Sequence, residues 1–303
     1  MKLLIADDDL TSRAMLQAIT SKCGFDPVLV EDGLQAWDIM STEDSPRLVL
    51  LDWEMPELDG LAVCRHIRQN EDNDPPYIIL LTGRSDTRDI VSGLDAGAND
   101  YISKPFDQAE LQARLRVGNR MLDLQSALQE ADTQLRFQAT HDALTGLLNR
   151  GAVMEKLEND LSRPQQERSS LCIGLCDIDH FKNINDTHGH LAGDEVLREI
   201  SRRFNQMLKP CDYIGRYGGE EFLFVIKVAD DNCTEPFEQI REIVAAEPFH
   251  FESWSIPVTI SIGITQFTPT AKSFDVINLL NQADKALYEA KNNGRNRIIM
   301  AST

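Results

Sequence analysis

The chain has 303 residues, of which 42% are hydrophobic, and its formal net charge is −19 at pH 7. This length leaves room for about two domains with sizeable cores. DNA and anionic membranes attract basic surfaces, so this acidic chain is expected to bind neither nucleic acid nor a membrane. The sequence has no apolar run of roughly 18 residues and turns acidic at Asp7, so neither a transmembrane helix nor a signal peptide is predicted. We therefore expect a cytoplasmic protein.

The first third of the chain alternates short apolar runs with amphipathic stretches. Helical patterns include residues 11–22 and 61–69, and strands are predicted at residues 3–6, 27–30, 48–51, 77–81 and 101–103. Five strands that alternate with helices predict an α/β fold, with a parallel sheet covered by helices on both faces.

Residues 107–140 contain no proline and a single glycine, Gly118, which predicts a long helix. Apolar residues recur along it at alternating intervals of three and four, as in the seam of a coiled coil: Met121, Leu124, Leu128, Ala131 and Leu135. About two heptads make a weak dimer contact on their own. A helix packed on its own domain is the alternative, but the seam is favoured because this stretch joins two domains.

The remainder of the chain has a different pattern. Helices are predicted at residues 150–161, 193–207, 237–246 and 274–290, and strands at residues 171–176, 213–216, 221–228, 257–266 and 297–300. Helices grouped between antiparallel strands predict an α+β domain, and the glycine-rich motifs of P-loop and Rossmann proteins do not occur. We expect domains at 1–118 and 141–303, joined by a helical linker at 119–140.

The six cysteines are scattered and form no CxxC pair, so reduced thiols are the simplest interpretation. Cys172 and Cys176 lie four residues apart on a predicted strand, share one face and are predicted to be core residues. The histidines show no metal-ligand spacing, and residues 188–190 are interpreted as a loop.

Charged residues follow the predicted parallel strands. Acids stand after the first and third strands, a lysine follows the fifth, and Thr82 ends the fourth: Asp7, Asp8, Asp9, Asp52 and Lys104. Carboxyl ends of parallel strands share one edge of a sheet, and converging carboxylates there call for a cation such as Mg²⁺. A phosphoryl group on Asp52 would then be neutralised by the metal and Lys104, with the Thr82 hydroxyl in contact.

Residues 4–9, 51–60, 81–82 and 101–106 make this half resemble a response regulator receiver domain. The resemblance implies a flavodoxin-like fold and a cognate histidine kinase as phosphodonor. It implies that Asp52 is the phosphoacceptor, that Asp7, Asp8 and the Glu54 carbonyl bind metal with it, that Thr82 and Tyr101 are switch residues, and that Lys104 contacts the phosphate.

A second site is indicated at Gly218 and Gly219, which read as a tight hairpin turn between apolar runs. Glu220 and Glu221 follow directly, so the tip combines little bulk with strong negative charge. Such a tip suits a backbone that approaches a nucleotide and an acid that holds a divalent cation. Upstream, the acidic stretch 177–186 follows the apolar run 171–176.

Residues 142–150, 177–186, 190–194, 216–222 and 283–296 resemble the GGDEF domain of diguanylate cyclases, in its GGEEF variant. The resemblance covers about residues 140–303 and implies a nucleotidyl cyclase or polymerase palm fold, GTP as substrate and Mg²⁺ as cofactor, with Mn²⁺ as an alternative. It places metal on Asp177, Glu220 and the Ile178 carbonyl. It implies that Asn185 and Asp194 read guanine, that Lys182, Lys291 and Arg295 hold phosphates, and that Glu221 is a second-metal ligand or the base.

A carboxylate at Asp194 can accept from N1–H and N2–H₂ of guanine, whereas adenine has an unprotonated N1, so GTP is predicted over ATP. Lys291 and Arg295 lie four apart and are expected on one face of a helix end. The inhibitory RxxD motif of the family is altered to Lys209-Pro210-Cys211-Asp212. Lysine cannot make the forked contact of arginine, so weak or absent product inhibition is predicted.

The predicted function is a phosphorylation-activated diguanylate cyclase. Its product joins two identical nucleotides, so two domains of a homodimer must face each other. By the family mechanism, phosphorylation at Asp52 changes receiver packing and re-registers the linker helices. The alternative is a non-catalytic adaptor that only binds nucleotide. A transcription factor would need a basic nucleic-acid-binding surface, which the sequence lacks.

Overall fold

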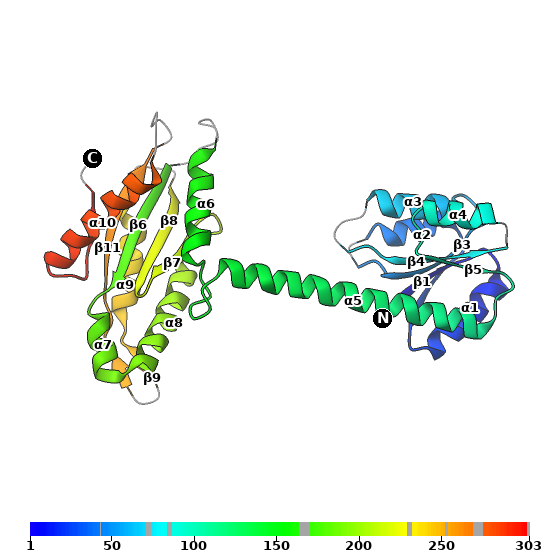
Figure 1. The fold of residues 1–303 in the computed structure, drawn as a ribbon, viewed down its shortest axis with the longest axis horizontal. Helices are drawn as coiled ribbons and strands as arrows, with labels where there is room; N and C mark the ends of the chain where they lie inside the picture. The colour runs from blue at the N-terminus through cyan, green and yellow to red at the C-terminus, as the bar shows by residue number, and fades with distance from the viewer. Residues whose placement is uncertain are drawn as a thin grey trace. The chain divides into compact units, whose positions relative to one another are not determined.

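In the computed structural model, the described residues are 1–42, 44–70, 74–83, 87–163, 170–228, 232–251, 254–268 and 275–301, with side chains omitted for 87–90. The chain divides into two units, Met1–Thr133 and Gln134–Thr303, each with its own sheet and helices (Figure 1). None of the described helices combines the length and the apolar character needed to cross a membrane. The domain limits at residues 118 and 140 stay a prediction.

The first unit is a parallel five-stranded sheet in the order β2-β1-β3-β4-β5. Its strands are β1 (Lys2–Ala6), β2 (Asp26–Val30), β3 (Leu48–Asp52), β4 (Tyr77–Thr82) and β5 (Asp100–Ser103). The helices that cover it are α1 (Leu10–Lys22), α2 (Gly33–Met40), α3 (Gly60–Gln69) and α4 (Thr87–Asp95), together with the first part of the long helix described below. The predicted α/β fold is confirmed.

The apolar runs of the first unit serve two cores, one on each face of the sheet. Along β1, Leu3 and Ile5 belong to one buried cluster, and Leu4 and Ala6 to the other. A strand buried on both faces requires a continuous apolar run, as parallel sheets generally do. An aspartate caps three of the helices by accepting a backbone N–H in the first turn: Asp9, Asp32 and Asp59.

The predicted long helix is α5 (Gln108–Thr140). Its first part packs on the first unit through a buried stripe of Leu111, Leu115, Gly118 and Leu122. Farther along, the Arg47 Nη1 donates to the Ser126 Oγ at 2.7 Å and holds the helix beside β3.

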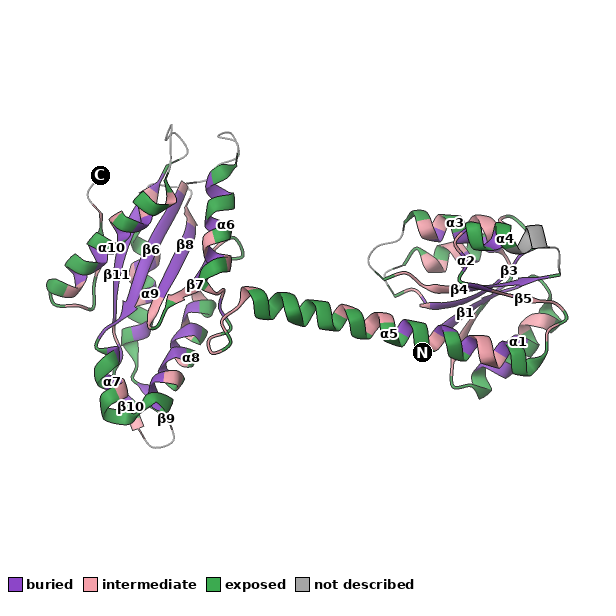
Figure 2. Cartoon of the chain, viewed as in Figure 1, coloured by how far each residue is buried: buried purple, intermediate pink, exposed green. Residues whose placement is uncertain are grey.

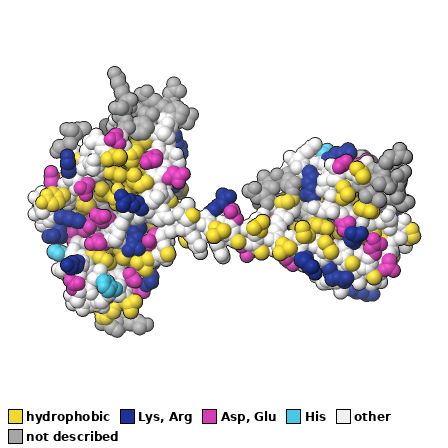
Figure 3. All heavy atoms as spheres, in the orientation of Figure 1, with side chains coloured by type: hydrophobic (Ala, Val, Ile, Leu, Met, Phe, Trp, Pro, Cys, Tyr) yellow, Lys and Arg dark blue, Asp and Glu magenta, His cyan; other side chains and the backbone are white. Residues whose placement is uncertain are grey.

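The predicted seam lies on the exposed side of α5. Its large side chains are uncovered, with exposed fractions of 52% for Met121, 59% for Leu124, 72% for Leu128 and 64% for Leu135. Figure 2 shows α5 exposed over most of its later turns, and Figure 3 shows hydrophobic side chains along it. One helix therefore combines a stripe buried on its own domain with a separate apolar seam left open.

The second unit contains a five-stranded sheet in the order β12-β11-β6-β8-β7, antiparallel except between β11 and β12. These strands are β6 (Ser170–Ile178), β7 (Tyr213–Gly218), β8 (Glu221–Val228), β11 (Ile260–Phe267) and β12 (Ile298–Met300). A small hairpin joins β9 (Phe249–Phe251) and β10 (Trp254–Ile256). The helices are α6 (Arg150–Ser162), α7 (Phe181–His188), α8 (His190–Met207), α9 (Thr234–Ala246) and α10 (Val276–Asn292). The predicted α+β domain is confirmed.

Two local expectations in this unit are wrong. Residues 188–190 are a helix junction rather than a loop, because His188 ends α7 and His190 begins α8, with Gly189 between them at a φ of 86°. Glycine adopts this left-handed backbone without steric cost. The strand expected from Pro257 begins only at Ile260. Proline has no N–H to donate to a strand ladder, which favours a start beyond it.

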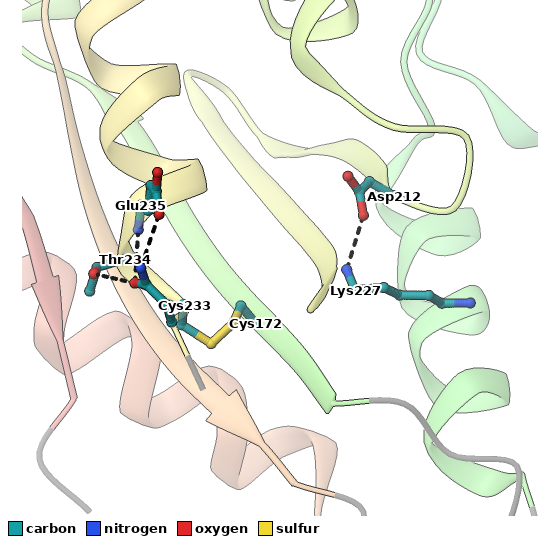
Figure 4. Close-up of a disulfide and its surroundings, with 7 residues drawn as sticks. Cys172, Asp212, Lys227, Cys233, Thr234 and Glu235 are labelled. Atoms are coloured by element: carbon teal, nitrogen blue, oxygen red, sulfur yellow. Dashed lines mark hydrogen bonds between the residues drawn. A yellow bond between two sulfur atoms is a disulfide. The ribbon is translucent and has the colours of Figure 1, made fainter. Parts of the chain in front are cut away.

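The expectation of reduced cysteines is also wrong for one pair. Cys172 is buried as predicted, but it forms a disulfide with Cys233, with their Cα atoms 5.5 Å apart (Figure 4). Cys233 is the N-cap residue of α9, so the bridge attaches the start of that helix to β6. Cys176 stays a free thiol, and burial raises its pKa.

Candidate functional site

Three carboxylates meet at one edge of the parallel sheet. Asp7 directly follows β1, Asp52 ends β3 beside it, and these two with Asp8 offer oxygens that all lie within 4.8 Å of one another. Asp7 and Asp52 are buried and Asp8 is exposed. The Lys104 Nζ donates to Asp7 Oδ2 at 2.7 Å and to Asp52 Oδ2 at 2.6 Å. The structure thus brings together the predicted acids and the predicted lysine.

The electrostatics of this cluster follow from burial and from Lys104. Burial raises the pKa of Asp52, and the bond from Lys104 offsets part of that effect. Burial would lower the pKa of Lys104, but its bonds to Asp52 and Asp7 outweigh this, so its pKa is raised and it stays charged. A set of carboxylate oxygens with one exposed member fits Mg²⁺, which prefers oxygen ligands and keeps several waters.

The predicted switch residues lie on neighbouring strands. Thr82 is buried at the end of β4, and its carbonyl accepts from the Lys104 N–H at 2.6 Å. Tyr101 on β5 is half-buried and packs against the sheet core. Glu54 is exposed, and its backbone N–H bonds to the carboxylate of Asp52. The roles of these residues stay predictions.

A second acidic edge forms in the second unit, where β6 ends and β8 begins. Asp177 faces Glu221 in the ladder, and the Ile178 N–H donates to the Glu220 carbonyl at 3.4 Å. Gly219 makes the hairpin turn at a φ of 43°, which a residue with a Cβ rarely adopts. The predicted hairpin therefore places the acids of Glu220 and Glu221 next to the end of β6.

Lys291 supplies the opposite charge at this edge. Its Nζ lies 2.7 Å from Asp177 Oδ2. Burial raises the pKa of Asp177, the charges of Glu220 and Glu221 raise it further, and Lys291 partly offsets them. Within the part of the chain that the structure describes, the cluster at Asp7 is the one set of three His, Cys, Asp or Glu residues whose ligand atoms all lie within 4.8 Å of one another. The predicted ligands here, two carboxylates and the Ile178 carbonyl, are nevertheless all hard oxygen donors that suit Mg²⁺.

The predicted guanine readers come from two packed helices. Asn185 lies on α7 and Asp194 on α8, and both are half-buried. A Cβ at Gly193 would lie 2.0 Å from the Asn185 Oδ1, so a larger residue there would displace the Asn185 side chain. Lys182 is exposed on α7. The packing thus brings Asn185 beside the position that precedes Asp194.

Contrary to expectation, Lys291 and Arg295 do not lie on one face of a helix. The helix α10 ends at Asn292, and Arg295 lies beyond it at a φ of 61°. The reason is Gly294, whose φ of 108° turns the chain after the helix, as glycine does at many helix ends. Arg295 is half-buried, and its N–H donates to the Ala290 carbonyl at 3.1 Å.

The altered inhibitory motif forms a turn held by its own aspartate. Asp212 accepts from the Lys209 N–H at 3.1 Å and from the Lys227 N–H at 3.0 Å, the second bond being drawn in Figure 4. A cavity of about 330 Å³ adjoins this turn, and Glu235 is among its lining residues. Asp212 thus has a structural role in the turn.

Sequence reasoning missed several polar residues around these sites. Arg216 bonds to Asp142 at 3.0 Å and to the Gly219 carbonyl at 2.9 Å, so it connects the hairpin to the start of the domain. Asp179 is buried two residues after Asp177 and bonds to the segment after α10. Its place in the acidic stretch was the available signal, but its partners lie far away in the sequence.

Two family models match the chain. Residues 139–297 match the GGDEF domain of diguanylate cyclases, and residues 3–116 match the response regulator receiver domain. The diguanylate cyclase DgcP of Pseudomonas aeruginosa is 38% identical over 192 residues, which are 63% of this chain and 28% of that protein. The response regulator PleD of Caulobacter vibrioides is 32% identical over 305 residues, which are 98% of this chain and 65% of that protein. The chain thus spans only part of the length of these curated relatives.

Solved structures agree with the match to the GGDEF domain. The coiled coil and GGDEF domain of DgcB from Caulobacter crescentus, in complex with c-di-GMP, has a TM-score of 0.55 and 31% identity, and the match covers 63% of this chain and 99% of that one. The diguanylate cyclase SiaD of Pseudomonas aeruginosa, in complex with its activator SiaC, has a TM-score of 0.52 and 31% identity, with 64% and 74% covered. The chain therefore belongs to the GGDEF family of diguanylate cyclases and carries a response regulator receiver domain before its GGDEF domain.

Proposed function

We propose that this protein is a diguanylate cyclase that condenses two GTP molecules into cyclic di-GMP and releases two pyrophosphates. The observation that carries the proposal is the meeting of Asp177, Ile178, Glu220 and Glu221 at one sheet edge, with Lys291 bonded to Asp177. Family membership and the names of the relatives support the same reaction. In each half-reaction a 3′-hydroxyl oxygen bonds to an α-phosphorus, and the bond from that phosphorus to pyrophosphate breaks.

The residues of this edge are assigned different roles in that reaction. Asp177, Glu220 and the Ile178 carbonyl would hold Mg²⁺ or Mn²⁺, which when bound would neutralise phosphate charge and help the leaving group. Glu221 accepts the proton of the attacking hydroxyl or binds a second ion. The cations of Lys182, Lys291 and Arg295 hold the phosphates, and the hairpin of Gly218 and Gly219 gives the backbone close access.

Base selection is assigned to Asn185 and Asp194. A carboxylate at Asp194 accepts from two guanine N–H groups and would face an unprotonated nitrogen of adenine, which leaves the carboxylate unpaired. The close packing at Gly193 fixes Asn185 on the neighbouring helix. GTP is therefore the expected substrate, and ATP is expected to be turned over far more slowly.

Regulation is assigned to the receiver half and to the seam of α5. One GGDEF domain binds one GTP, so ring closure needs two domains that face each other in a homodimer. Phosphoryl transfer from a histidine kinase to Asp52 converts its carboxylate into an acyl phosphate, which carries about −1.5 to −2 charges beside Lys104. We infer that the switch residues Thr82 and Tyr101 respond, and that α5 pairs with its copy through the exposed seam, which raises the effective concentration of one active site at the other.

The test uses purified protein, Mg²⁺ and either GTP or ATP, with pyrophosphate release as the readout. GTP is expected to release pyrophosphate, ATP little, and Asp177→Ala or Glu220→Ala none. Glu195→Ala, which removes an exposed acid on α8, is the matched control and should retain the wild-type rate. Binding of GTP without any release would favour the nucleotide-binding adaptor instead.

A further inference from the structure

A buried carboxylate that the proposed reaction does not use connects three segments of the cyclase half. Asp179 is 5% exposed. Its Oδ2 accepts from the Asn296 N–H at 3.0 Å and from the Thr259 hydroxyl at 2.7 Å, and its Oδ1 accepts from the Ser261 hydroxyl at 2.7 Å. These partners are 117, 80 and 82 residues away in the sequence. A buried carboxylate needs such bonds to offset the loss of water, so this set is specific to the folded domain.

The segment that Asp179 holds has an unusual backbone. Gly294, Arg295 and Asn296 follow one another with φ values of 108°, 61° and 46°. Residues other than glycine rarely adopt positive φ, and they keep it only where surrounding contacts determine it. Asn296 is held from both sides, because its N–H donates to Asp179 and its Oδ1 accepts from the Arg241 Nη1 on α9 at 2.8 Å.

The geometry links this segment to the catalytic edge through one strand end. Asp177 bonds to Lys291 at 2.7 Å, and Asp179, two residues later, bonds to Asn296 at 3.0 Å. Arg295 lies between Lys291 and Asn296 in the sequence. Residues at and just after the end of β6 therefore hold both ends of the stretch 291–296, which contains Arg295, beside the carboxylate of Asp177.

We propose that Asp179 is a positioning residue for the cyclase reaction. It holds the segment 294–296 in its left-handed conformation so that Arg295 meets the phosphates of GTP bound at the edge of Asp177. Asp179 itself does not touch the substrate. The inference rests on the proposed function, because it assumes that Arg295 binds GTP phosphates there.

The experiment compares Asp179→Ala with Asp160→Ala in the full chain. Asp160 is a matched control, because it is also a buried carboxylate of this half, 8% exposed, and it accepts from the Tyr213 hydroxyl away from the acidic edge. Three quantities are measured: the thermal midpoint, the KM and kcat for GTP, and the affinity for a non-hydrolysable GTP analogue.

Both variants should unfold at lower temperature, and only Asp179→Ala should weaken GTP binding. Its KM and the dissociation constant of the analogue should rise about tenfold or more, as expected for the loss of one hydrogen bond to a charged group. Asp179→Asn keeps an acceptor for the Asn296 N–H and should recover part of this loss. Arg241→Gln releases Asn296 from the other side and should also raise KM, without touching Asp179.

An Asp179→Ala protein that loses thermal stability yet keeps the wild-type KM and analogue affinity would make Asp179 merely structural and overturn the proposal. If that variant does not fold, unchanged KM values in both Asp179→Asn and Arg241→Gln would overturn it equally. If the wild-type protein turns over GTP and the variants keep its KM and analogue affinity, this inference is refuted and the proposed function is not. A wild-type protein that neither binds the analogue nor turns over GTP would refute the proposed function, and this inference with it.

Discussion

The exposed seam of α5 gives a quantitative prediction for Leu128. Its side chain is 72% exposed in the protomer, so most of its surface is free to be buried against a second helix. Full burial of a leucine contributes roughly 1.5–3 kcal/mol, so the exposed part gives about 1–2 kcal/mol per protomer and about 2–4 kcal/mol per symmetric dimer. Leu128→Ala should therefore weaken dimerisation by about 30- to 700-fold.

The assay is sedimentation equilibrium of protein loaded with beryllofluoride as a phosphoryl mimic, combined with cyclase rates over a range of protein concentrations. Leu128→Ala should shift the dimer constant and lower the rate at low concentration, and a high concentration should restore the rate by mass action. Glu130→Ala changes an exposed residue off the seam on the same helix and should leave the dimer constant near that of the wild type. A wild-type dimer that Leu128→Ala leaves unchanged would refute the assignment of this seam to the interface.

Three further predictions concern the cyclase half. Opening the disulfide by Cys233→Ser should lower the thermal midpoint of this half, because a bridge across a sequence separation of 61 residues contributes about 4 kcal/mol by loop entropy. Cys211→Ser, at an exposed free thiol, is the control in the same calorimetric measurement. Equal midpoints for the wild type, Cys233→Ser and Cys211→Ser would contradict this prediction. At Asp142, bonds from Thr145 and Arg216 outweigh burial and lower the pKa, so its stabilising contribution is present above the unfolded pKa of about 3.9 and is lost as pH falls through the lower folded value. The gap in thermal midpoint between wild type and Asp142→Asn should hold steady near neutral pH and narrow below about pH 4, and a gap that widens there would be inconsistent with the pair. Added cyclic di-GMP should inhibit only weakly, because Lys209 replaces the arginine of the inhibitory motif; sub-micromolar inhibition that disappears in Asp212→Ala would show the opposite.

Much of the fold could be predicted because the strands are marked by continuous apolar runs. The predicted strand at residues 221–228 has the observed limits of β8, and the runs on β1 and β3 are apolar throughout because both faces of that sheet are buried. The helix α7 was not predicted, since only Phe181 and Ile184 of its eight residues are buried and this gives too short a pattern. Its place is set by packing against α8.

The predictable part of the sites consists of residues at strand ends. Asp7, Asp52 and Lys104 converge because carboxyl ends of parallel strands share an edge, which the pattern of strands already implies. The disulfide of Cys172 and the bonds of Asp179 could not be predicted, because they join residues 61 to 117 positions apart and depend on how helices and strands pack. The turn after α10 was predictable in principle from Gly294, since glycine after the last helical residue ends a helix in this way.

The central claim is that the acids at the end of β6 and on the neighbouring hairpin support nucleotidyl transfer. The most direct measurement is mass-resolved analysis of products from GTP and Mg²⁺, with and without beryllofluoride. The account predicts cyclic di-GMP with two pyrophosphates per product, formed faster with the phosphoryl mimic and absent in Glu220→Ala. Intact GTP after incubation of folded, Mg²⁺-supplied wild-type protein in both states would contradict it.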